Sequence, residues 1–351
     1  MVKLGLIGNG GMCKAAHAPA YRDDPRAEVA AVCDIIEERA VDLRDTFFPQ
    51  ASVYTDYRAL LKDPSIDAVD ICTPNDLHSE IAVAALNAGK HVFCEKPDAI
   101  DVPKALAMQT AAQAGGKVLM VMRNNRFSAA SRYLKQYIDA GRAGEIYCGR
   151  CGWQRRRGIP GKGGWFTTKA RSGGGPLIDL GVHMIDLAVW LMGNPKPVAV
   201  SANTYRKFAD SDLSDSVNSD FGDKAAGGTF DVEDLAMGMI RFENGAVLQI
   251  EFSWASNIKE ERRFVELRGT KAGVKWEDER AEIYTEENGW LLNAAPQPVR
   301  DDNGHLNNLR HFLDVLTEGA SPCYQPQQGV DMIRILCAVY ESAETGREVR
   351  L

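Results

Sequence analysis

Three polar residues in the middle of the chain have a spacing suited to acid–base chemistry. Asp179, His183 and Asp186 interrupt the apolar stretch Leu177–Met192, and a helix over that stretch aligns them along one face. Because burial of such groups without partners costs several kcal/mol, they must pair with one another, with backbone or with a ligand. A carboxylate one turn from a histidine can orient the imidazole and raise its basicity. We therefore expect Asp179 and His183 to bind substrate and act in catalysis, and Asp186 to be structural.

Two other interpretations of this helix stay open. The three groups could form a satisfied structural network inside the protein. They could also bind zinc, because a histidine with two carboxylates is a possible ligand set. No H-E-x-x-H pattern or companion histidine cluster supports a metal, so we predict none.

A glycine-rich loop near the N-terminus has the context of a dinucleotide-binding turn. Gly8-Asn9-Gly10-Gly11-Met12-Cys13 directly follows an apolar run, 2–7, that is typical of a strand, and the loop opens a helix. Gly8 permits the tight turn, Gly10 lets the backbone approach a pyrophosphate, and the helix N-terminus supplies unpaired N–H groups. Cys13 stands where Gly or Ala is usual, which is a mild departure because cysteine is small. The alternative is a purely structural turn.

An acidic cluster after the second predicted strand bears on which dinucleotide binds. Asp34 ends that strand, where a carboxylate accepts hydrogen bonds from the hydroxyls of the adenosine ribose. Glu37 and Glu38 follow, and the first arginine of this neighbourhood is Arg39. Because these carboxylates would repel a ribose 2′-phosphate, we expect NAD as the cofactor, with NADP less favoured.

Two further motifs follow predicted strands of the same half. Thr73, Pro74 and Asn75 come after the predicted strand 68–72, and Lys96 comes after the predicted strand 91–94. Because open α/β sheets bind ligands at the carboxyl ends of parallel strands, we expect both motifs at the cofactor. Lys96 is a candidate acid–base or electrostatic group, although a single lysine is usually a solvated surface residue. Asn75 could equally belong to a helix N-cap.

A glycine-rich segment with aromatic and basic residues precedes the Asp–His helix. It runs from Trp153-Gln-Arg-Arg-Arg157 to Gly161–Phe166 and includes Arg156 and Trp165. Aromatic rings beside planar hydrogen-bond donors suit a hydroxyl-rich ligand such as a sugar. We expect this segment to form a substrate lid in which Arg156 and Trp165 contact the substrate. An ordinary surface hairpin with a solvated arginine run is the plainer alternative.

The first 122 residues contain the alternating elements that must position the cofactor motifs. Strands are expected at 2–7, 28–33, 68–72, 91–94 and 118–122. The segments between them, such as 77–88 and 102–114, have helix-period apolar spacing. Repeated β-α-β units predict a doubly wound parallel sheet with helices on both faces, so we assign a Rossmann domain that binds NAD(P) to residues 1–122.

Residues 123–351 have a different pattern. Strand-like runs follow one another without helices between them, and hairpin-like turns such as Glu243-Asn244-Gly245 join several of them. Helical segments flank these runs at 128–140, 177–192, 306–317 and 329–345. The pattern predicts a second, α+β domain over residues 123–351 with an antiparallel or mixed sheet.

Composition and charge exclude several classes of protein. The 351 residues are 45% hydrophobic and 25% charged, which is typical of a globular chain of about two domains. A net charge of −7 disfavours nucleic-acid binding, because an acidic surface repels phosphate backbones. No uninterrupted apolar stretch approaches about 18 residues, and no targeting signal precedes the first strand. We therefore expect no membrane span and a cytoplasmic setting, in which the 8 cysteines are reduced.

Four motifs, in the order in which they occur, resemble the Gfo/Idh/MocA oxidoreductase family, which includes glucose–fructose oxidoreductase and inositol dehydrogenases. They are G-N-G-G at 8–11, C-T-P-N-D-L-H at 72–78, E-K-P at 95–97 and D-L-G-V-H at 179–183. The resemblance covers essentially the whole chain. It implies an N-terminal Rossmann domain and a C-terminal substrate-binding domain with an open, mostly antiparallel sheet. Because that open face commonly forms subunit contacts, a homodimer or homotetramer is expected.

The resemblance also implies roles for single residues. Lys96 matches the catalytic lysine of the family, and Asp179 and His183 match its aspartate and histidine. The residues that match cofactor-lining positions are His78, Glu95 and Pro97. Asn124 and Asn125 fall where family members touch nicotinamide or substrate.

The expected function is a dehydrogenase that transfers a hydride between a secondary alcohol of a sugar, inositol-like polyol or glycoside and nicotinamide. His183 would take the hydroxyl proton, Lys96 would hold the oxygen, and Asp179 would orient His183 or bind a neighbouring hydroxyl. Whether Lys96 or His183 is the formal base stays open. The alternatives are a non-catalytic NAD-binding sensor on the same fold and a glycoside-modifying enzyme whose NAD oxidation is transient. A metal-dependent hydrolase is the last alternative function.

Overall fold

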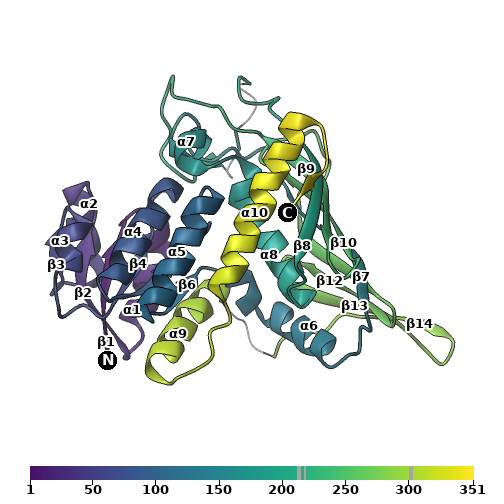
Figure 1. Cartoon of the computed structure of the whole chain (residues 1–351), viewed down its shortest axis with the longest axis horizontal. Helices are drawn as coiled ribbons and strands as arrows, with labels where there is room; N and C mark the ends of the chain where they lie inside the picture. Colours follow the sequence, from purple (N-terminus) through teal and green to yellow (C-terminus); the bar gives the residue numbers. More distant parts are fainter. Residues whose placement is uncertain (212–214, 217–218, 300–302) are drawn as a thin grey trace. The chain divides into compact units, whose positions relative to one another are not determined.

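Two sheets divide the chain into two units (Figure 1). The computed structural model describes residues 1–351 except 212–214, 217–218 and 300–302. The first unit comprises Met1–Asn124 and His305–Ile333, and the second comprises Asn125–Gly304 and Arg334–Leu351.

The sheet of the first unit has six parallel strands in the order β3-β2-β1-β4-β5-β6. They are β1 (Val2–Ile7), β2 (Ala27–Cys33), β3 (Ser52–Tyr54), β4 (Ala68–Ile71), β5 (His91–Cys94) and β6 (Leu119–Val121). This order is that of the Rossmann fold, so the predicted fold class is confirmed. The sequence pattern missed β3, because three residues with no buried side chain carry too little periodicity.

The helices of the first unit lie between its strands, and a capping aspartate begins two of them. They are η1 (Cys13–His17), α1 (Ala18–Arg22), α2 (Glu37–Phe47), α3 (Tyr57–Leu61), α4 (Asn75–Asn87) and α5 (Val102–Gly115). Asp101 caps α5 by accepting the backbone N–H of Lys104, and α5 stops at Gly116 in the left-handed conformation. The first helix opens with η1, a π-helical turn that follows the glycine-rich loop.

The first unit also contains residues 305–333, which we had expected in the domain 123–351. These residues include α9 (Gly304–Thr317) and the start of α10 (Pro326–Thr345). The ring of Phe312 lies 5.4 Å from that of Phe93 on β5, and Asn308 accepts the backbone N–H of Arg123 at 2.6 Å. The sequence pattern shows that such a helix has an apolar face, but not which sheet covers that face.

The second unit is built on a nine-stranded sheet in the order β14-β13-β12-β11-β7-β10-β9-β8-β15. Its strands are β7 (Ile146–Gln154), β8 (Pro197–Tyr205), β9 (Leu235–Phe242), β10 (Val247–Ser253), β11 (Arg262–Gly269), β12 (Ala272–Glu277), β13 (Arg280–Glu287), β14 (Trp290–Ala294) and β15 (Val349–Arg350). Neighbours are antiparallel except β7 and β10, which are parallel. The sheet is therefore mixed and mostly antiparallel, as expected.

Helices pack against this sheet along one face. The helices that precede α9 in this unit are η2 (Asn124–Phe127), α6 (Ala129–Asp139), η3 (Trp165–Thr167), α7 (Lys169–Ser172), η4 (Leu177–Gly181) and α8 (Val182–Leu191). α6 contacts β12 and β13, α8 contacts β7 and β11, and η4 contacts β10. On β9 the side chains of Met237 and Met239 are exposed, whereas those of Ala236 and Ile240 are buried. This alternation is typical of a sheet with one covered and one open face.

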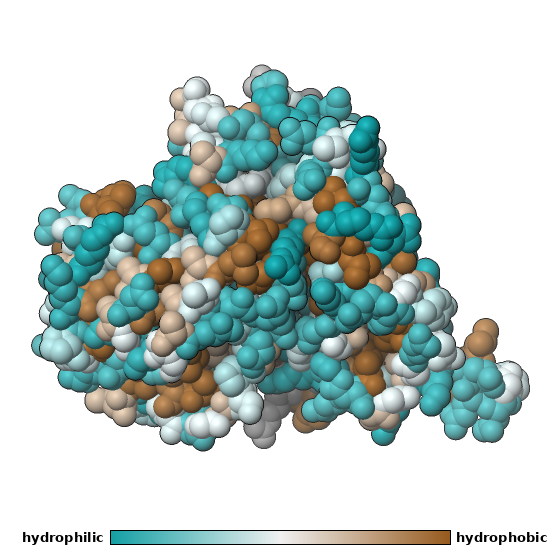
Figure 2. All heavy atoms as spheres, viewed as in Figure 1, coloured by the Kyte–Doolittle hydropathy of each residue, from teal (hydrophilic) through white to brown (hydrophobic). Residues whose placement is uncertain are grey.

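One helical stretch of the second unit, Lys169–Leu191, is long and apolar enough by length and composition to cross a membrane. Our sequence criterion did not select it, because polar residues interrupt the apolar run. In the structure, 78% of its 18-residue window is buried inside the protein, as in the core helix of a globular unit. On the face drawn in Figure 2, hydrophobic side chains lie in separate patches among hydrophilic ones. We therefore interpret Lys169–Leu191 as a core segment.

Candidate active site

The glycine-rich loop after β1 has the geometry that the sequence predicts. Gly8 has φ +88°, and a Cβ there would lie 2.7 Å from the carbonyl carbon of Cys72, so both conformation and packing require glycine. The backbone N–H of Asn9 donates to Asp34 Oδ2 at 2.8 Å. The carboxylate at the end of β2 therefore holds the loop in place.

Open space and unpaired buried atoms around this loop fit a bound dinucleotide. A Cβ at Gly10 or Gly11 would meet nothing within 4 Å, so there is room for a pyrophosphate to approach the backbone. The helix follows immediately, with Met12 half-buried in its first turn. Asn9 Oδ1 and Thr73 Oγ1 are buried and have no hydrogen-bond partner in the described part of the chain. Since buried polar atoms are normally bonded, a ligand that reaches both would complete the loop.

Asp34 keeps acceptor positions beyond the one that holds the loop. It is 9% exposed, and its second oxygen, Oδ1, accepts the backbone N–H of Ile36 at 2.9 Å. An ionised carboxylate has about four acceptor positions, so two remain for ribose hydroxyls. The side chains of Glu37 and Glu38, in the first turn of α2, are exposed beside it.

Replacing Asp34 by Ser is expected to lower kcat/KM for NAD by about 10- to 100-fold, because hydrogen bonds to a charged group are lost. The ratio of kcat/KM with NADP to that with NAD should rise, because a negative charge near the 2′-phosphate is removed. Steady-state kinetics with both cofactors measure this ratio. Asp45→Asn, which removes one exposed charge from the last turn of α2, is the control and should change the ratio little. An unchanged ratio in D34S would show that Asp34 does not discriminate between NAD and NADP.

Lys96 lies just beyond the carboxyl end of β5, half-buried, in a segment tied to the loop after β4. The tie is His78 of α4, which is fully buried: Nδ1 contacts Pro97 O at 2.7 Å and Nε2 contacts Thr73 O at 2.9 Å. Burial lowers the pKa of His78. The structure thus gives His78 a clear structural task, holding the two strand-end motifs together. Pro74 occupies the N-cap position of α4 without a side-chain cap hydrogen bond, and Asn75 is the first helical residue, one position after the N-cap role that the alternative interpretation gave it.

A buried histidine that the sequence analysis did not select lies beside Glu95. His17, in η1, contacts Asp70 Oδ2 through Nδ1 at 2.7 Å and Glu95 Oε1 through Nε2 at 2.8 Å. Burial by itself lowers the pKa of His17, but the two carboxylates together raise it well above its usual value. Burial by itself raises the pKa of Glu95, and His17, with a smaller contribution from Lys96, outweighs burial and lowers it to about 2. We infer a buried imidazolium between two carboxylates.

This cluster also has the composition of a metal site. Ligand atoms of His17, Asp70 and Cys72 all lie within 4.8 Å of one another. The 2.7 Å between His17 Nδ1 and Asp70 Oδ2 is a hydrogen-bond length. Two ligands on one zinc ion would be about 3.3 Å apart, given bonds of about 2.0 Å in a tetrahedron. The geometry therefore favours a shared proton over a shared metal.

Replacing His17 by Gln is expected to lower the free energy of unfolding by about 3 kcal/mol, because two buried carboxylates lose their only shared cation among the described residues. Urea unfolding followed by circular dichroism at neutral pH measures this loss. Lys14→Gln is the matched control: it removes a cation from the same helix, where Lys14 pairs with Asp42 at the surface, and should cost less than about 1 kcal/mol. A similarly small loss in H17Q would contradict the inferred imidazolium.

In the second unit, Asp179 and His183 are partly exposed on a helical segment whose other side chains are mostly buried. Asp179 Oδ2 accepts the indole N–H of Trp254 at 2.9 Å, and Trp254 is fully buried at the end of β10. The ring of His183 lies 6.0 Å from that of Trp153 on β7. Both proposed catalytic side chains are therefore partly exposed and lie beside an indole group, the buried Trp254 for Asp179 and the half-buried Trp153 for His183.

Asp186 has a different environment from the other two. Arg126 of η2 donates to it twice, through Nε at 2.7 Å and Nη2 at 2.6 Å, and both side chains are buried. Asp186 thus forms a buried ion pair with Arg126, which agrees with the structural role expected for it. The regular helix expected over Leu177–Met192 begins as a π-helix in η4, which adds a residue to the turn. The extra residue changes the helical phase between Asp179 and Asp186.

The structure brings Arg155, and not Arg156, toward the Asp–His helix. Arg156 is exposed, and its backbone N–H donates to Glu261. Arg155 is mostly buried, with its guanidinium 5.2 Å from the ring of Trp153; burial lowers its pKa, and the charge of Asp179 acts against that shift. Alternation along an extended chain places residues two apart on the same side, so counting from Trp153 selects Arg155. This alternation could have been used to select Arg155 from the sequence alone.

The expected substrate lid is packed against another loop of the same unit. A Cβ at Gly163 would lie 1.9 Å from Ala225 O, and one at Gly164 would lie 2.2 Å from Asp223 O. Trp165 is half-buried and stacks on Phe166 at 3.8 Å. Asn125 is buried in η2. We predicted that Trp165 and Asn125 contact the substrate. Both residues belong to the second unit, and their contact with substrate stays a prediction.

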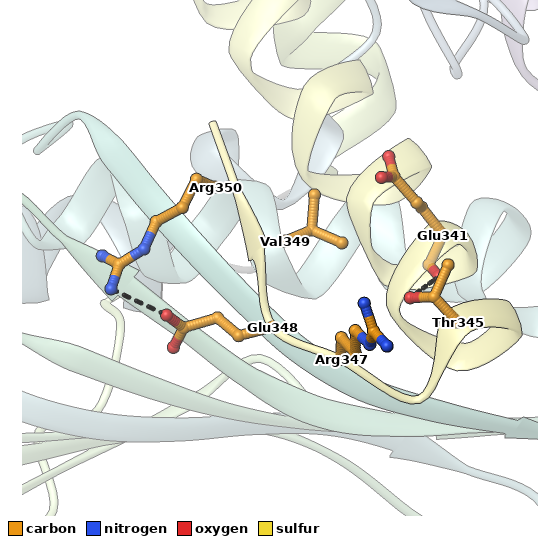
Figure 3. Close-up of a pocket in the computed structure, with 6 residues that line it drawn as sticks. All are labelled: Glu341, Thr345, Arg347, Glu348, Val349 and Arg350. Carbon is orange, nitrogen blue, oxygen red and sulfur yellow. Dashed lines mark hydrogen bonds and ion pairs between the residues drawn. The ribbon is translucent and has the colours of Figure 1, made fainter.

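A separate hollow of about 560 Å³ lies between the end of α10 and β15 (Figure 3). It is lined by Glu341, Thr345, Arg347, Glu348, Val349 and Arg350. Arg350 pairs with Glu348 at 2.9 Å, and Thr345 donates to its own helix at Glu341 O. None of the predicted site residues lines it, so we do not assign the candidate active site to this hollow.

Known families match both units. Residues 2–123 match the family described as "Oxidoreductase family, NAD-binding Rossmann fold", and residues 131–275 match the "GFO/IDH/MocA C-terminal domain". The chain is 36% identical over 351 residues to D-glucoside 3-dehydrogenase of Escherichia coli (strain K12), covering 100% of this chain and 97% of that protein. It is 34% identical over 292 residues to levoglucosan dehydrogenase of Pseudarthrobacter phenanthrenivorans (strain DSM 18606 / JCM 16027 / LMG 23796 / Sphe3), covering 80% and 74%. The structure of a levoglucosan dehydrogenase in complex with NADH has a TM-score of 0.87 to this chain at 28% identity, covering 99% and 98%.

Proposed function

Because the chain belongs to the Gfo/Idh/MocA family of oxidoreductases, whose N-terminal domain is an NAD-binding Rossmann fold, we propose that it oxidises a secondary hydroxyl group of a glucoside or related sugar. The observation that carries this proposal is the environment of Asp179 and His183, which are partly exposed on a mostly buried helical segment. The similarity to a D-glucoside 3-dehydrogenase over the whole chain supports C3 of a D-glucoside as the first position to test.

The proposed reaction divides the work among three side chains. The nicotinamide of NAD would supply the acceptor for the hydride that leaves the carbinol carbon. His183 takes the proton of the substrate hydroxyl, and Lys96 binds the same oxygen and stabilises its developing negative charge. Asp179 orients His183 or binds a neighbouring hydroxyl, with Trp254 holding its Oδ2. Cofactor contacts are proposed for the glycine-rich loop, Asp34 and the strand-end residues that the sequence analysis selected.

The proposal is tested by incubating the protein with NAD and a panel of methyl glucosides, levoglucosan and myo-inositol, and following NADH at 340 nm. We expect NADH formation with a pyranoside and a keto product at one ring carbon. Cofactor binding without turnover on any substrate would instead favour a sensor. Cleavage of a glycoside without net NADH would favour an enzyme in which the oxidation is transient.

We further propose that copies of the chain associate as a homodimer or homotetramer through the open face of the nine-stranded sheet. Tyr205, Met237 and Met239 are exposed large side chains on adjacent strands β8 and β9, and apolar groups of this size are more common at interfaces than on solvated sheet faces. Light scattering measures the mass in solution. A monomer at micromolar concentration would refute this assembly.

A further inference from the structure

A buried carboxylate lies at the beginning of the helical segment that carries Asp179 and His183. Glu233, two residues before β9, is 7% exposed. Its Oε2 accepts the backbone N–H of Gly175 at 2.9 Å, and its Oε1 accepts that of Leu177 at 3.1 Å. The hydroxyl of Tyr340, on α10, donates to Oε1 at 3.0 Å. One carboxylate therefore receives three hydrogen bonds from two separate parts of the second unit.

The two backbone donors are ones that the helix itself cannot satisfy. N–H groups in the first turn of a helix have no acceptor within it. Gly175 and Leu177 flank Pro176, which has no N–H, and the N–H groups of Ile178 and Asp179 both donate to Gly175 O. Glu233 thus acts as a remote cap, and its negative charge lies at the positive end of the helix dipole.

Close packing leaves this turn little freedom to settle elsewhere. A Cβ at Gly175 would lie 2.0 Å from Glu233 O, and one at Gly174 would lie 1.8 Å from the hydroxyl oxygen of Tyr340. The next residue, Asp234, accepts the backbone N–H of Trp254 through its carbonyl at 3.0 Å. The indole of Trp254 donates in turn to the carboxylate of Asp179. Glu233 therefore binds the turn just before Asp179, and Asp234 binds the backbone of the residue that holds the Asp179 side chain.

We propose that Glu233 is a positioning residue for the reaction: its carboxylate fixes the N-terminal turn of the segment 175–183 and thereby the placement of Asp179 and His183. The proposal rests on the proposed function for its catalytic consequence. Glu233 itself touches only backbone and Tyr340 among the contacts given above.

The protonation state of this cap changes near neutral pH. Burial raises the pKa of Glu233 to about 7, against the opposing effect of its hydrogen bonds from Gly175, Leu177 and Tyr340. The ionisable groups around it are Tyr340, with Cys337 beside that residue on α10, and Lys169 of α7, whose Nζ lies 5.7 Å from the Tyr340 ring. A protonated carboxyl carries a hydrogen on an oxygen that must accept from an N–H. Protonation therefore weakens the cap, and turnover should fall as pH drops below about 7.

The test compares Glu233→Gln with the wild type under saturating NAD. An amide places an NH₂ group where one backbone N–H needs an acceptor, so we expect kcat to fall about tenfold with the KM for NAD unchanged. In a plot of kcat against pH, the decrease below about pH 7 that protonation of Glu233 causes should be absent in E233Q. In Tyr340→Phe the carboxylate loses a donor, so the same limb should move to higher pH. Glu243→Gln is the matched control, because Glu243 accepts a backbone N–H at the other end of β9 but is exposed.

A second measurement does not depend on activity. Amide hydrogen exchange of residues 174–183 should be faster in E233Q than in wild type or E243Q, because the turn has lost its cap. Unchanged exchange in this segment would overturn the proposal, whether or not the protein is active. In an active protein, wild-type kcat and pH profile in E233Q would also overturn it. Absence of NADH formation by the wild type on every sugar tested would count against the proposed function and not against the cap.

Discussion

Replacing His183 by alanine is expected to lower kcat for the oxidation of a glucoside by about 10²- to 10⁴-fold, which is the usual contribution of a positioned general base. The reason is the position of the ring, which is partly exposed on a buried helix, one turn after an aspartate held by Trp254. Without the imidazole, the hydroxyl proton loses its proposed acceptor. Affinity for NAD should be little changed, because the predicted cofactor contacts lie in the first unit.

Single-turnover formation of NADH measures the chemical step in this variant, and fluorescence titration measures NAD affinity. His91→Ala is the control for loss of an imidazole elsewhere: His91 lies on β5 and accepts the backbone N–H of Val118, so its loss should affect stability more than kcat. Full activity in H183A would remove His183 from the mechanism. A large rise in KM with unchanged kcat would assign it to substrate binding instead.

Replacing Lys96 by alanine is expected to lower kcat by at least about 10²-fold, as for loss of a donor that stabilises a developing oxyanion. The effect should come from the ammonium group alone, since the backbone N–H of Lys96 still donates to Glu95 Oε2 in the variant. The Glu95–His17–Asp70 cluster would therefore remain intact, and the free energy of unfolding should change little.

Comparison of pH profiles for K96A and H183A decides which residue is the formal base, because the variant that lacks the base loses the corresponding limb. Lys104→Ala is the matched control for Lys96. Lys104 is a half-exposed lysine of the same unit, paired with Asp101 at 3.5 Å on α5, and its loss should leave kcat unchanged. Equal activities of K96A and K104A would show that Lys96 takes no part in the reaction.

The sequence by itself determined the features that depend on neighbouring residues. The turn at Gly8 needs positive φ and the absence of a Cβ, so its glycine reads directly as a tight turn after a strand. Asp34 follows β2 at the distance where a ribose carboxylate is found, and the motifs after β4 and β5 follow the strands that carry them. Local periodicity therefore predicted the Rossmann sheet and the strand ends at which the candidate site residues lie, with the short strand β3 as the omission.

Other features were decided only by the tertiary structure, because they join residues far apart in the chain. His17 meets Asp70 and Glu95 across 53 and 78 residues, and Glu233 caps a helix that begins more than 50 residues earlier. No local pattern marks such contacts, since a lone histidine or glutamate has the same appearance on a surface as in a core. The choice of sheet for 305–333 and the π-turn of η4 have the same origin. Packing against a distant partner decides both, and periodicity records only that an apolar face exists.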